Sequence, residues 1–227
     1  MILHIPHSST KLSNFIELQG KEENLFVLTD SYTNDLFEHD DETIIFPYSR
    51  FVCDVERFID DPMDEIGQGI IYRKDYYGFD IKRNISDEKT LEIYNFHHDH
   101  FNKKVNFQLG LYPKVVIVDC HSYWPWAFSV NNDIDICIGT DPYHTPNELK
   151  NIVYDYFKTN GYNVAINNPF NGSIVPDVHY KNNEDVYSIM IEVNKNLYYH
   201  NTDSYNRTKS VIKGVLEQIE QFEQSFI

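Results

Sequence analysis

Three side chains that can bind a metal ion or exchange protons occur in or just after apolar, strand-like segments of this chain. His7 follows MILHI, His121 follows KVVIVDC, and Glu192 lies inside SIMIEV. Imidazole is both a metal ligand and a general base, and a carboxylate buried among apolar residues is costly unless it is paired or functional. Because open α/β sheets bind ligands beyond the carboxyl ends of their strands, we expect these groups to share one edge.

The elements that would position these residues alternate in type. Short segments rich in branched and aromatic residues are typical of strands, and several are apolar at successive positions, which indicates burial on both faces. Longer amphipathic segments between them are typical of helices. The predicted strands are 1–5, 43–47, 51–55, 114–120, 135–139, 163–167 and 188–193, and the predicted helices are 31–39, 87–109, 145–160 and 204–223.

This alternation predicts an α/β fold in which helices cover a layered, largely parallel sheet. Proline and glycine are scattered and no linker stands out, so we expect a single domain over residues 1–227. With 41% hydrophobic residues the chain has ample material for a core of that size.

Charge and cysteine usage exclude several classes of function. The net charge of −16 repels a phosphate backbone or an anionic lipid surface, and no basic patch offsets it, so we expect neither nucleic-acid nor membrane partners. No signal peptide or long apolar segment is evident, which predicts a cytoplasmic protein. The three cysteines are odd in number and widely spaced, which argues against a disulfide framework. The sequence does not indicate an oligomeric state.

Several other polar residues have a structural interpretation that competes with a functional one. His4 lies within a predicted strand, where a core role is the more common one. Asp119 either forms a turn or holds the imidazole of His121 through its second ring nitrogen. In NFHHDHF the helical spacing puts His97 and His100 on one face and His98 elsewhere, which favours structural or substrate-contacting roles over metal ligation.

Several blocks of residues occur together in a recognisable order. They are HIPHSS, TDSYTNDLF, SRFVCDVERF, GQGIIYRKDYYG, VDCHSYW and SIMIEVNKNLY. In order and spacing the sequence resembles the N-formylglutamate amidohydrolase family from about His4 to Tyr199. That family is similar to zinc carboxypeptidases and aspartoacylases, which implies a three-layer α/β/α fold of the phosphorylase/hydrolase-like type with a mixed, largely parallel sheet. The resemblance also implies that His7 and His121 bind the metal and that Glu192 is the catalytic general base.

The third metal ligand departs from the carboxypeptidase pattern. Those enzymes place a glutamate three residues after the first histidine, but this chain has Thr10 there. A carboxylate must therefore come from another segment. Asp30 is the first choice because it lies in a shared block near the start of a predicted helix, and Asp35 and Asp54 are the alternatives.

Arginines in the shared blocks suggest how a substrate is bound. An N-acyl amino acid carries a carboxylate, which arginine binds through two parallel hydrogen bonds. Arg50 and Arg83 are the leading candidates, followed by Arg57, although ion pairs with the many acids are an alternative role. His98 and Asn168, the latter in a further family-like block NNPFNGS, complete the predicted substrate-binding set.

The sequence thus predicts a metal-dependent amidohydrolase that acts on an N-formyl or N-acyl amino acid, with zinc as the expected metal. A family member that binds a small carboxylate ligand without turnover is the alternative, and Thr10 keeps it open. A thiol mechanism through Cys120 is disfavoured, because its neighbour His121 would point to the opposite face of the strand.

Overall fold

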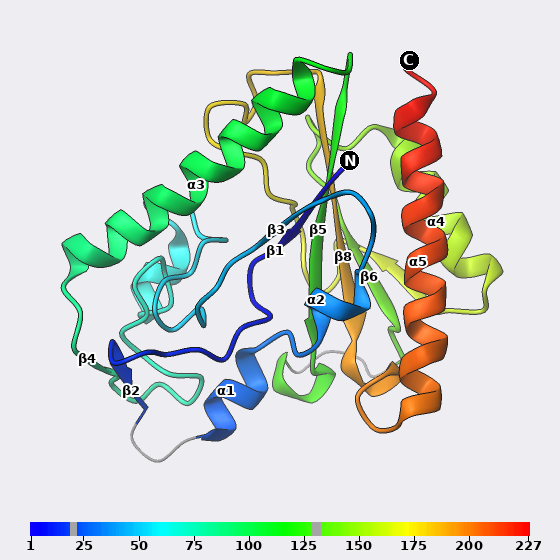
Figure 1. Cartoon of the computed structure of the whole chain (residues 1–227). Helices are drawn as coiled ribbons and strands as arrows, with labels where there is room; N and C mark the ends of the chain where they lie inside the picture. Colours follow the sequence, from blue (N-terminus) through cyan, green and yellow to red (C-terminus); the bar gives the residue numbers. More distant parts are fainter. Residues whose placement is uncertain (19–21, 129–132) are drawn as a thin grey trace.

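A mixed sheet lies at the centre of the protein, whose computed structural model describes residues 1–18, 22–128 and 133–227 (Figure 1). Within these ranges the sheet has six strands in the order β3-β1-β5-β8-β6-β7, and all neighbours are parallel except β6 and β8. The strands are β1 (Ile2–Ile5), β3 (Glu42–Ile45), β5 (Val115–Tyr123), β6 (Ile136–Gly139), β7 (Val164–Ile166) and β8 (Val186–Asn194).

Helices cover the sheet on both sides. In Figure 1, α4 and α5 lie on one face and the long α3 crosses the other, which gives the predicted three-layer α/β/α arrangement. The short α1 and α2 connect β1 to β3, and β2 and β4 form a small separate antiparallel pair. The bounds are α1 (Glu22–Leu28), α2 (Thr33–Leu36), α3 (Asp87–Leu109), α4 (Asn147–Thr159), α5 (Thr202–Gln224), β2 (Ile16–Glu17), β4 (Lys82–Arg83) and the 3-10 turns η1 (Pro62–Ile66), η2 (Pro125–Phe128) and η3 (Lys195–Leu197).

The two faces of the central strands differ in chemistry. Val118 and Cys120 of β5 and Ile191 of β8 pack into the apolar core beneath α4 and α5. The residues between them point to the α3 side, where Asp119, His121 and other polar groups are buried. One face therefore stabilises the fold, and the other can hold a site.

All predicted strands except 51–55 are present, as is each predicted helix, although the helix expected at 31–39 is shortened to α2. Residues 51–55 form turns, and their apolar character reflects burial in a loop. The carbonyls of Phe51 and Val52 accept hydrogen bonds from the Arg83 guanidinium, which substitutes for a neighbouring strand. None of the helices in the described ranges is long and apolar enough to cross a lipid bilayer.

Candidate active site

The two longest strands place His121 and Glu192 side by side. β5 and β8 are parallel neighbours, and their register pairs His121 with Glu192. Paired residues on adjacent strands lie about 5 Å apart and point to the same face. The backbone hydrogen bonds of the sheet therefore set the spacing of these two groups. Cys120 points to the opposite face, in the apolar core, as the sequence predicted.

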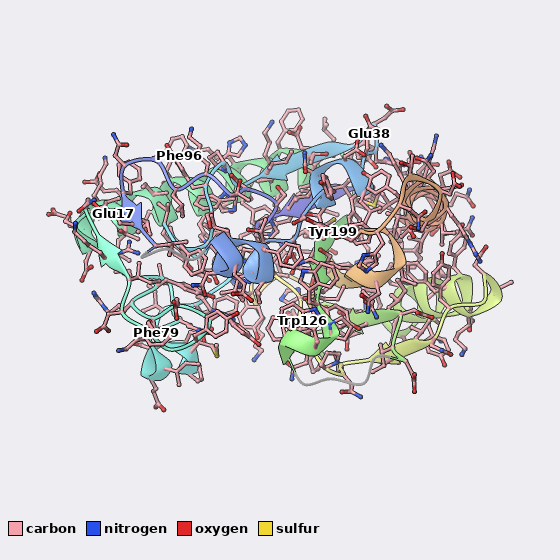
Figure 2. The ribbon with its side chains drawn as sticks, turned by 90° about the horizontal axis from the view of Figure 1, so that it is seen from below. Glu17, Glu38, Phe79, Phe96, Trp126 and Tyr199 are labelled. Carbon is pink, nitrogen blue, oxygen red and sulfur yellow. The ribbon has the colours of Figure 1, made fainter. Side chains whose placement is uncertain are left out.

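His7 and Asp30 reach the same place from loops. His7 lies two residues beyond β1, and Asp30 lies between α1 and α2. The backbone N–H of Asp30 donates to the carbonyl of His7 (2.9 Å), so the two loops are joined directly. The Thr33 hydroxyl donates to the Asp30 carbonyl (2.8 Å) at the start of α2. His7 and Asp30 thus lie at the carboxyl edge of β5 and β8. Figure 2 shows the protein from below, the side of this edge, with Trp126 and Tyr199 labelled close to it.

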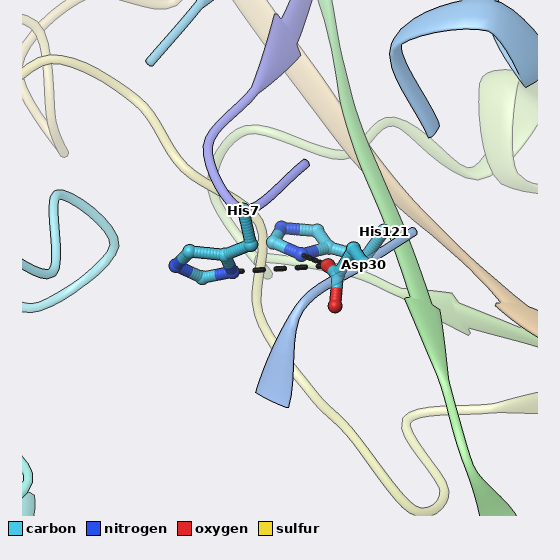
Figure 3. Close-up of side chains that lie close together, drawn as sticks. All are labelled: His7, Asp30 and His121. Atoms are coloured by element: carbon cyan, nitrogen blue, oxygen red, sulfur yellow. Dashed lines mark hydrogen bonds and ion pairs between the residues drawn. The ribbon is translucent and has the colours of Figure 1, made fainter. Parts of the chain in front are cut away.

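Both histidines turn a ring nitrogen toward one oxygen of Asp30 (Figure 3). The distance from Asp30 Oδ2 is 2.9 Å to His121 Nδ1 and 3.8 Å to His7 Nδ1. All three side chains are buried. The expected trio of His7, Asp30 and His121 therefore converges, and it comes from three segments that are far apart in the sequence.

The other nitrogen of each ring is held by an aspartate. His7 Nε2 lies 2.8 Å from Asp54 Oδ1, and His121 Nε2 lies 3.1 Å from Asp119 Oδ1. Carboxylates in this position fix the orientation and tautomer of histidines that bind metals. His7 Nδ1 is buried and has no hydrogen-bond partner among the described residues. Its neighbour Asp30 Oδ2 lies 3.8 Å away, beyond hydrogen-bonding distance, and a cation between these groups would satisfy both.

The electrostatics of the trio favour added positive charge. Burial alone would lower the pKa of His121, yet the negative charge and hydrogen bond of Asp119, together with Asp30, raise it well above its usual value. Burial would likewise raise the pKa of Asp30, but its contacts with His121 and His7 hold that pKa below the usual range. Since these carboxylates stay ionised in a buried place, a divalent cation is well suited to balance them.

Glu192 is a buried carboxylate beside the trio. Its side chain is 7% exposed, and its Oε2 has no hydrogen-bond partner within the described part of the chain. Burial raises the pKa of Glu192 to about 8, although the neighbouring charge of His121 opposes this. A carboxyl group that titrates near neutral pH is able both to take up and to return a proton.

These groups open onto a cavity of about 490 Å³, within the usual range of about 300–1,000 Å³ for small-molecule sites. His7, Asp30, His121 and Glu192 line it, as do Arg50 and Arg57. The cavity therefore combines the trio, a free carboxylate oxygen and cationic side chains in one place.

Comparison with known proteins identifies the family and the fold of the chain. The family model of N-formylglutamate amidohydrolase matches residues 1–199. The chain belongs to that family. Its fold is similar to the crystal structure of N-formylglutamate amidohydrolase from Ralstonia eutropha JMP134, with a TM-score of 0.82 at 15% identity over 100% of this chain and 94% of that one.

A gene product of Agrobacterium tumefaciens is also similar, with a TM-score of 0.63 at 16% identity over 97% of this chain and 91% of that one. A search of the curated proteins finds no match to this sequence. The fold and the family of this N-formylglutamate amidohydrolase-like chain are thus established, together with its coarse class as an amidohydrolase.

The candidates for the third ligand separate clearly in this family member. Asp35 lies on the surface, where it contacts Tyr205 and Lys209 of α5. Asp54 is committed to His7 Nε2 and accepts two hydrogen bonds from Arg50 (3.1 and 2.8 Å). Asp30 is the candidate that shares a centre with both histidines. A carboxylate is therefore present although position 10 is threonine.

The predicted substrate-binding residues divide into two groups. Arg50 and Arg57 line the cavity, but Arg83, His98 and Asn168 do not. Arg83 donates to backbone carbonyls and to the Thr90 hydroxyl, and so it supports a loop.

His98 Nε2 contacts the carbonyl of Val55 (3.0 Å), and Asn168 is exposed just before the cavity-lining Pro169. Family-like motifs did not distinguish residues that form the cavity from residues that support it.

Sequence reasoning missed two charged residues near the trio. Glu56 lines the cavity and pairs with His4 Nδ1 (3.0 Å). Lys195 is fully buried, and its ammonium donates to the carbonyl of Thr29 (2.6 Å), next to Asp30. Burial lowers the pKa of Lys195 to about 8. The sequence does contain a signal for Lys195, because it lies three residues after Glu192 at the end of an apolar strand.

Proposed function

We propose that this protein is a metal-dependent hydrolase that cleaves the amide bond of an N-formyl or N-acyl amino acid, with zinc as its metal. The observation that carries the proposal is the convergence of His7, Asp30 and His121, whose ligand atoms lie within 4.8 Å of one another. Family membership supports the amidohydrolase part of the proposal.

The donor set fits such a metal. Two imidazole nitrogens and one carboxylate oxygen are a common ligand set for zinc sites that keep an open coordination position. Two observations support this fit: His7 Nδ1 makes no hydrogen bond within the described part of the chain, and an aspartate lies behind each ring. In that role His7, His121 and Asp30 would hold the metal, and zinc bound there would polarise the amide carbonyl and lower the pKa of water.

Glu192 moves the protons of the reaction. It takes a proton from the attacking water and returns it to the nitrogen of the leaving amine, because amide cleavage needs both transfers. Burial raises the pKa of Glu192 toward the neutral range, where a carboxyl group can both accept and return a proton. Burial of the carboxylate beside His121 also limits competition from bulk water.

Arg50 and Arg57 bind the carboxylate of the substrate. Both reach the cavity, and they share Asp54 as a counter-ion, which lies 3.6 Å from Arg57 Nε. Two guanidinium groups share Asp54, so this one carboxylate does not neutralise both of them. Asp54 also contacts His7, so the arginines are held at a fixed distance from the trio.

The test is metal analysis of the purified full-length protein, followed by hydrolysis assays on N-formyl, N-acetyl and N-succinyl amino acids with and without a strong chelator. We expect about one zinc per chain and hydrolysis that chelation abolishes and added zinc restores. Hydrolysis that is indifferent to chelation would refute the metal mechanism. Tight binding of these compounds without turnover would instead identify a non-catalytic binding protein.

A further inference from the structure

The cavity has two chemically different sides, and the trio lies between them. On one side Arg50 contacts Asp54, and Asp54 contacts His7 at the end of β1. On the other side three aromatic rings form part of the lining. Tyr123 at the end of β5, Phe128 at the end of η2, and Phe170 in the loop after β7 line it together. We refer to these three rings as the aromatic side.

Strand order fixes how far apart the two sides lie. His7 follows β1, His121 is on β5, and Glu192 is on β8. The next strand is β6, where Cys137 pairs with Glu192, and its thiol contacts the carbonyl of Phe170 (3.3 Å). With neighbouring strands about 4.8 Å apart, β1 and β6 are separated by roughly 14 Å. A ligand that reaches from the end of β1 to Phe170 beside β6 therefore passes over β5 and β8, which carry His121 and Glu192.

The aromatic side is a packed surface. The Phe170 ring centroid lies 5.3 Å from that of Tyr123 and 5.2 Å from that of Phe128, both edge-on. The Tyr123 hydroxyl donates to the carbonyl of Ile134 (3.0 Å), and Tyr123 is only 2% exposed, so it is packed into the wall behind the other two rings. Phe128 remains 37% exposed. Apolar surface of this kind at the wall of a polar cavity favours an apolar ligand group.

The chemistry of an N-acyl amino acid gives the two sides different occupants. The carboxylate is attached to the amine side of the scissile bond and the acyl group to the carbonyl side, so they extend in opposite directions. With the carboxylate at Arg50 and Arg57 and the amide beside His121 and Glu192, the acyl group extends toward the aromatic side. A formyl group has only a hydrogen beyond its carbonyl and would leave Phe128 and Phe170 without a ligand group against them.

We propose that the aromatic side is an acyl pocket, and that the substrates are N-acyl amino acids whose acyl group is apolar or aromatic and larger than formyl. This inference rests on the proposed function, because it takes the amide to lie at the trio. It assigns Tyr123, Phe128 and Phe170 to substrate selection. Burying an added apolar group against these rings in the transition state raises kcat/KM.

The experiment compares N-formyl-, N-acetyl- and N-phenylacetyl-alanine on the zinc-loaded, full-length protein. We expect kcat/KM to rise along this series and to be at least about tenfold higher for phenylacetyl than for formyl. N-formyl-phenylalanine is the matched probe, since it moves the ring to the amino acid. A preference for N-formyl-phenylalanine over N-phenylacetyl-alanine would overturn the proposal.

Variants test which residues produce the preference for a larger acyl group. Phe170→Ala should reduce the ratio of phenylacetyl to formyl hydrolysis about tenfold, whereas Phe107→Ala, on the exposed part of α3, should leave that ratio unchanged. An equal effect of Phe170→Ala on both substrates would overturn the acyl pocket. Formyl hydrolysis that matches or exceeds the others refutes the pocket but keeps the proposed function, whereas no hydrolysis of any amide refutes both.

Discussion

Two histidine–carboxylate groups lie next to each other on β1 and β5, and they have opposite character. One is the trio of His7, Asp30 and His121. The other consists of His4, Glu56 and Asp119, in which His4 Nδ1 lies 3.0 Å from Glu56 and 3.1 Å from Asp119. Each group brings its ligand atoms within 4.8 Å of one another, so their composition and spacing do not tell them apart.

The hydrogen bonds of their histidines distinguish the two groups. His4 is fully buried and uses both ring nitrogens, since Nε2 contacts His97 Nε2 (2.9 Å). Burial opposes charge on His4, but hydrogen bonds with Asp119 and Glu56 raise its pKa to about 9. Burial lowers the pKa of His97 to about 2. His4 is therefore a buried cation that balances two acids, whereas His7 Nδ1, 3.8 Å from Asp30, makes no hydrogen bond among the described residues. An open nitrogen, rather than the residue types, marks the candidate metal site.

The largest expected effect is the loss of kcat when Glu192, which lies beside His7, Asp30 and His121, is replaced. Glu192→Gln removes the proton carrier and keeps the shape of the side chain, so kcat should fall about 10³- to 10⁴-fold. Zinc content should stay the same, because the side chain at position 192 is not a ligand in our proposal. Steady-state kinetics and metal analysis check both expectations, and a variant that retains more than a tenth of wild-type kcat would refute the role of Glu192.

The second group should govern stability instead. His4→Ala leaves the carboxylates of Glu56 and Asp119 without their buried cation, which should reduce the free energy of unfolding by about 3–5 kcal/mol. Urea denaturation measures this loss. The exposed His100→Ala on α3 serves as the control, with little change expected. If the folded His4→Ala protein keeps wild-type stability but loses zinc, the two groups have been assigned the wrong way round.

The protonation of His4 also predicts a pH dependence. Because its pKa is raised from 6.5 to about 9 in the folded state, its contribution is complete below pH 6.5 and is lost as pH rises through about 9. The shift corresponds to about 3 kcal/mol. The difference in unfolding free energy between wild-type and His4→Gln, both zinc-loaded, should shrink by about this amount from pH 6.5 to 9. A constant difference would show that His4 is not charged.

Asp54 contacts His7 of the first group, whereas Glu56 belongs to the second group. We expect Asp54 to support zinc affinity and Glu56 to support the stability of the fold. Asp54→Asn weakens the orientation of His7, so zinc affinity should fall about 10- to 100-fold, as measured by competition with a chromophoric chelator. Glu56→Gln, in the other group, should destabilise the fold with a smaller effect on zinc affinity. Equal effects of the two substitutions on affinity would erase the distinction between the groups.

The smallest effect concerns a carboxylate outside both groups. Asp35→Asn removes an ion pair with Lys209 in which the Asp35 side chain is 51% exposed. Exposed pairs of this kind contribute about 1 kcal/mol or less, so thermal unfolding should change only slightly. Zinc affinity and kcat should match wild type. A loss of bound zinc would restore Asp35 as the third ligand in place of Asp30.

Much of the fold was predictable because its signals are local. The apolar runs of β5 and β8 and the amphipathic pattern of α3 predict those elements within a few residues. The strand predicted at 51–55 fails because burial alone produces the same pattern, and the partner of its carbonyls is Arg83, which lies about thirty residues along the chain. Strand order and the antiparallel β6 carry no local signal.

The site residues could be predicted where metal binding or proton transfer requires a particular type of side chain. His7, His121 and Glu192 follow from polar side chains in or after strands, and family resemblance assigned their roles. The choice among Asp30, Asp35 and Asp54 depends on how loops fold back over the sheet, which only the structure provides. The same holds for Arg83 and His98, whose side chains support loops.

The reactive groups and the cavity walls come from different kinds of backbone. His121 and Glu192 are fixed by the hydrogen-bonded register of β5 and β8, whereas Phe128 and Phe170 lie in connections between strands. Connections tolerate change better than central strands. We therefore expect sequence change in this scaffold to fall mainly in 125–128 and 169–173, which would reshape the cavity wall and leave the spacing of His121 and Glu192 unchanged.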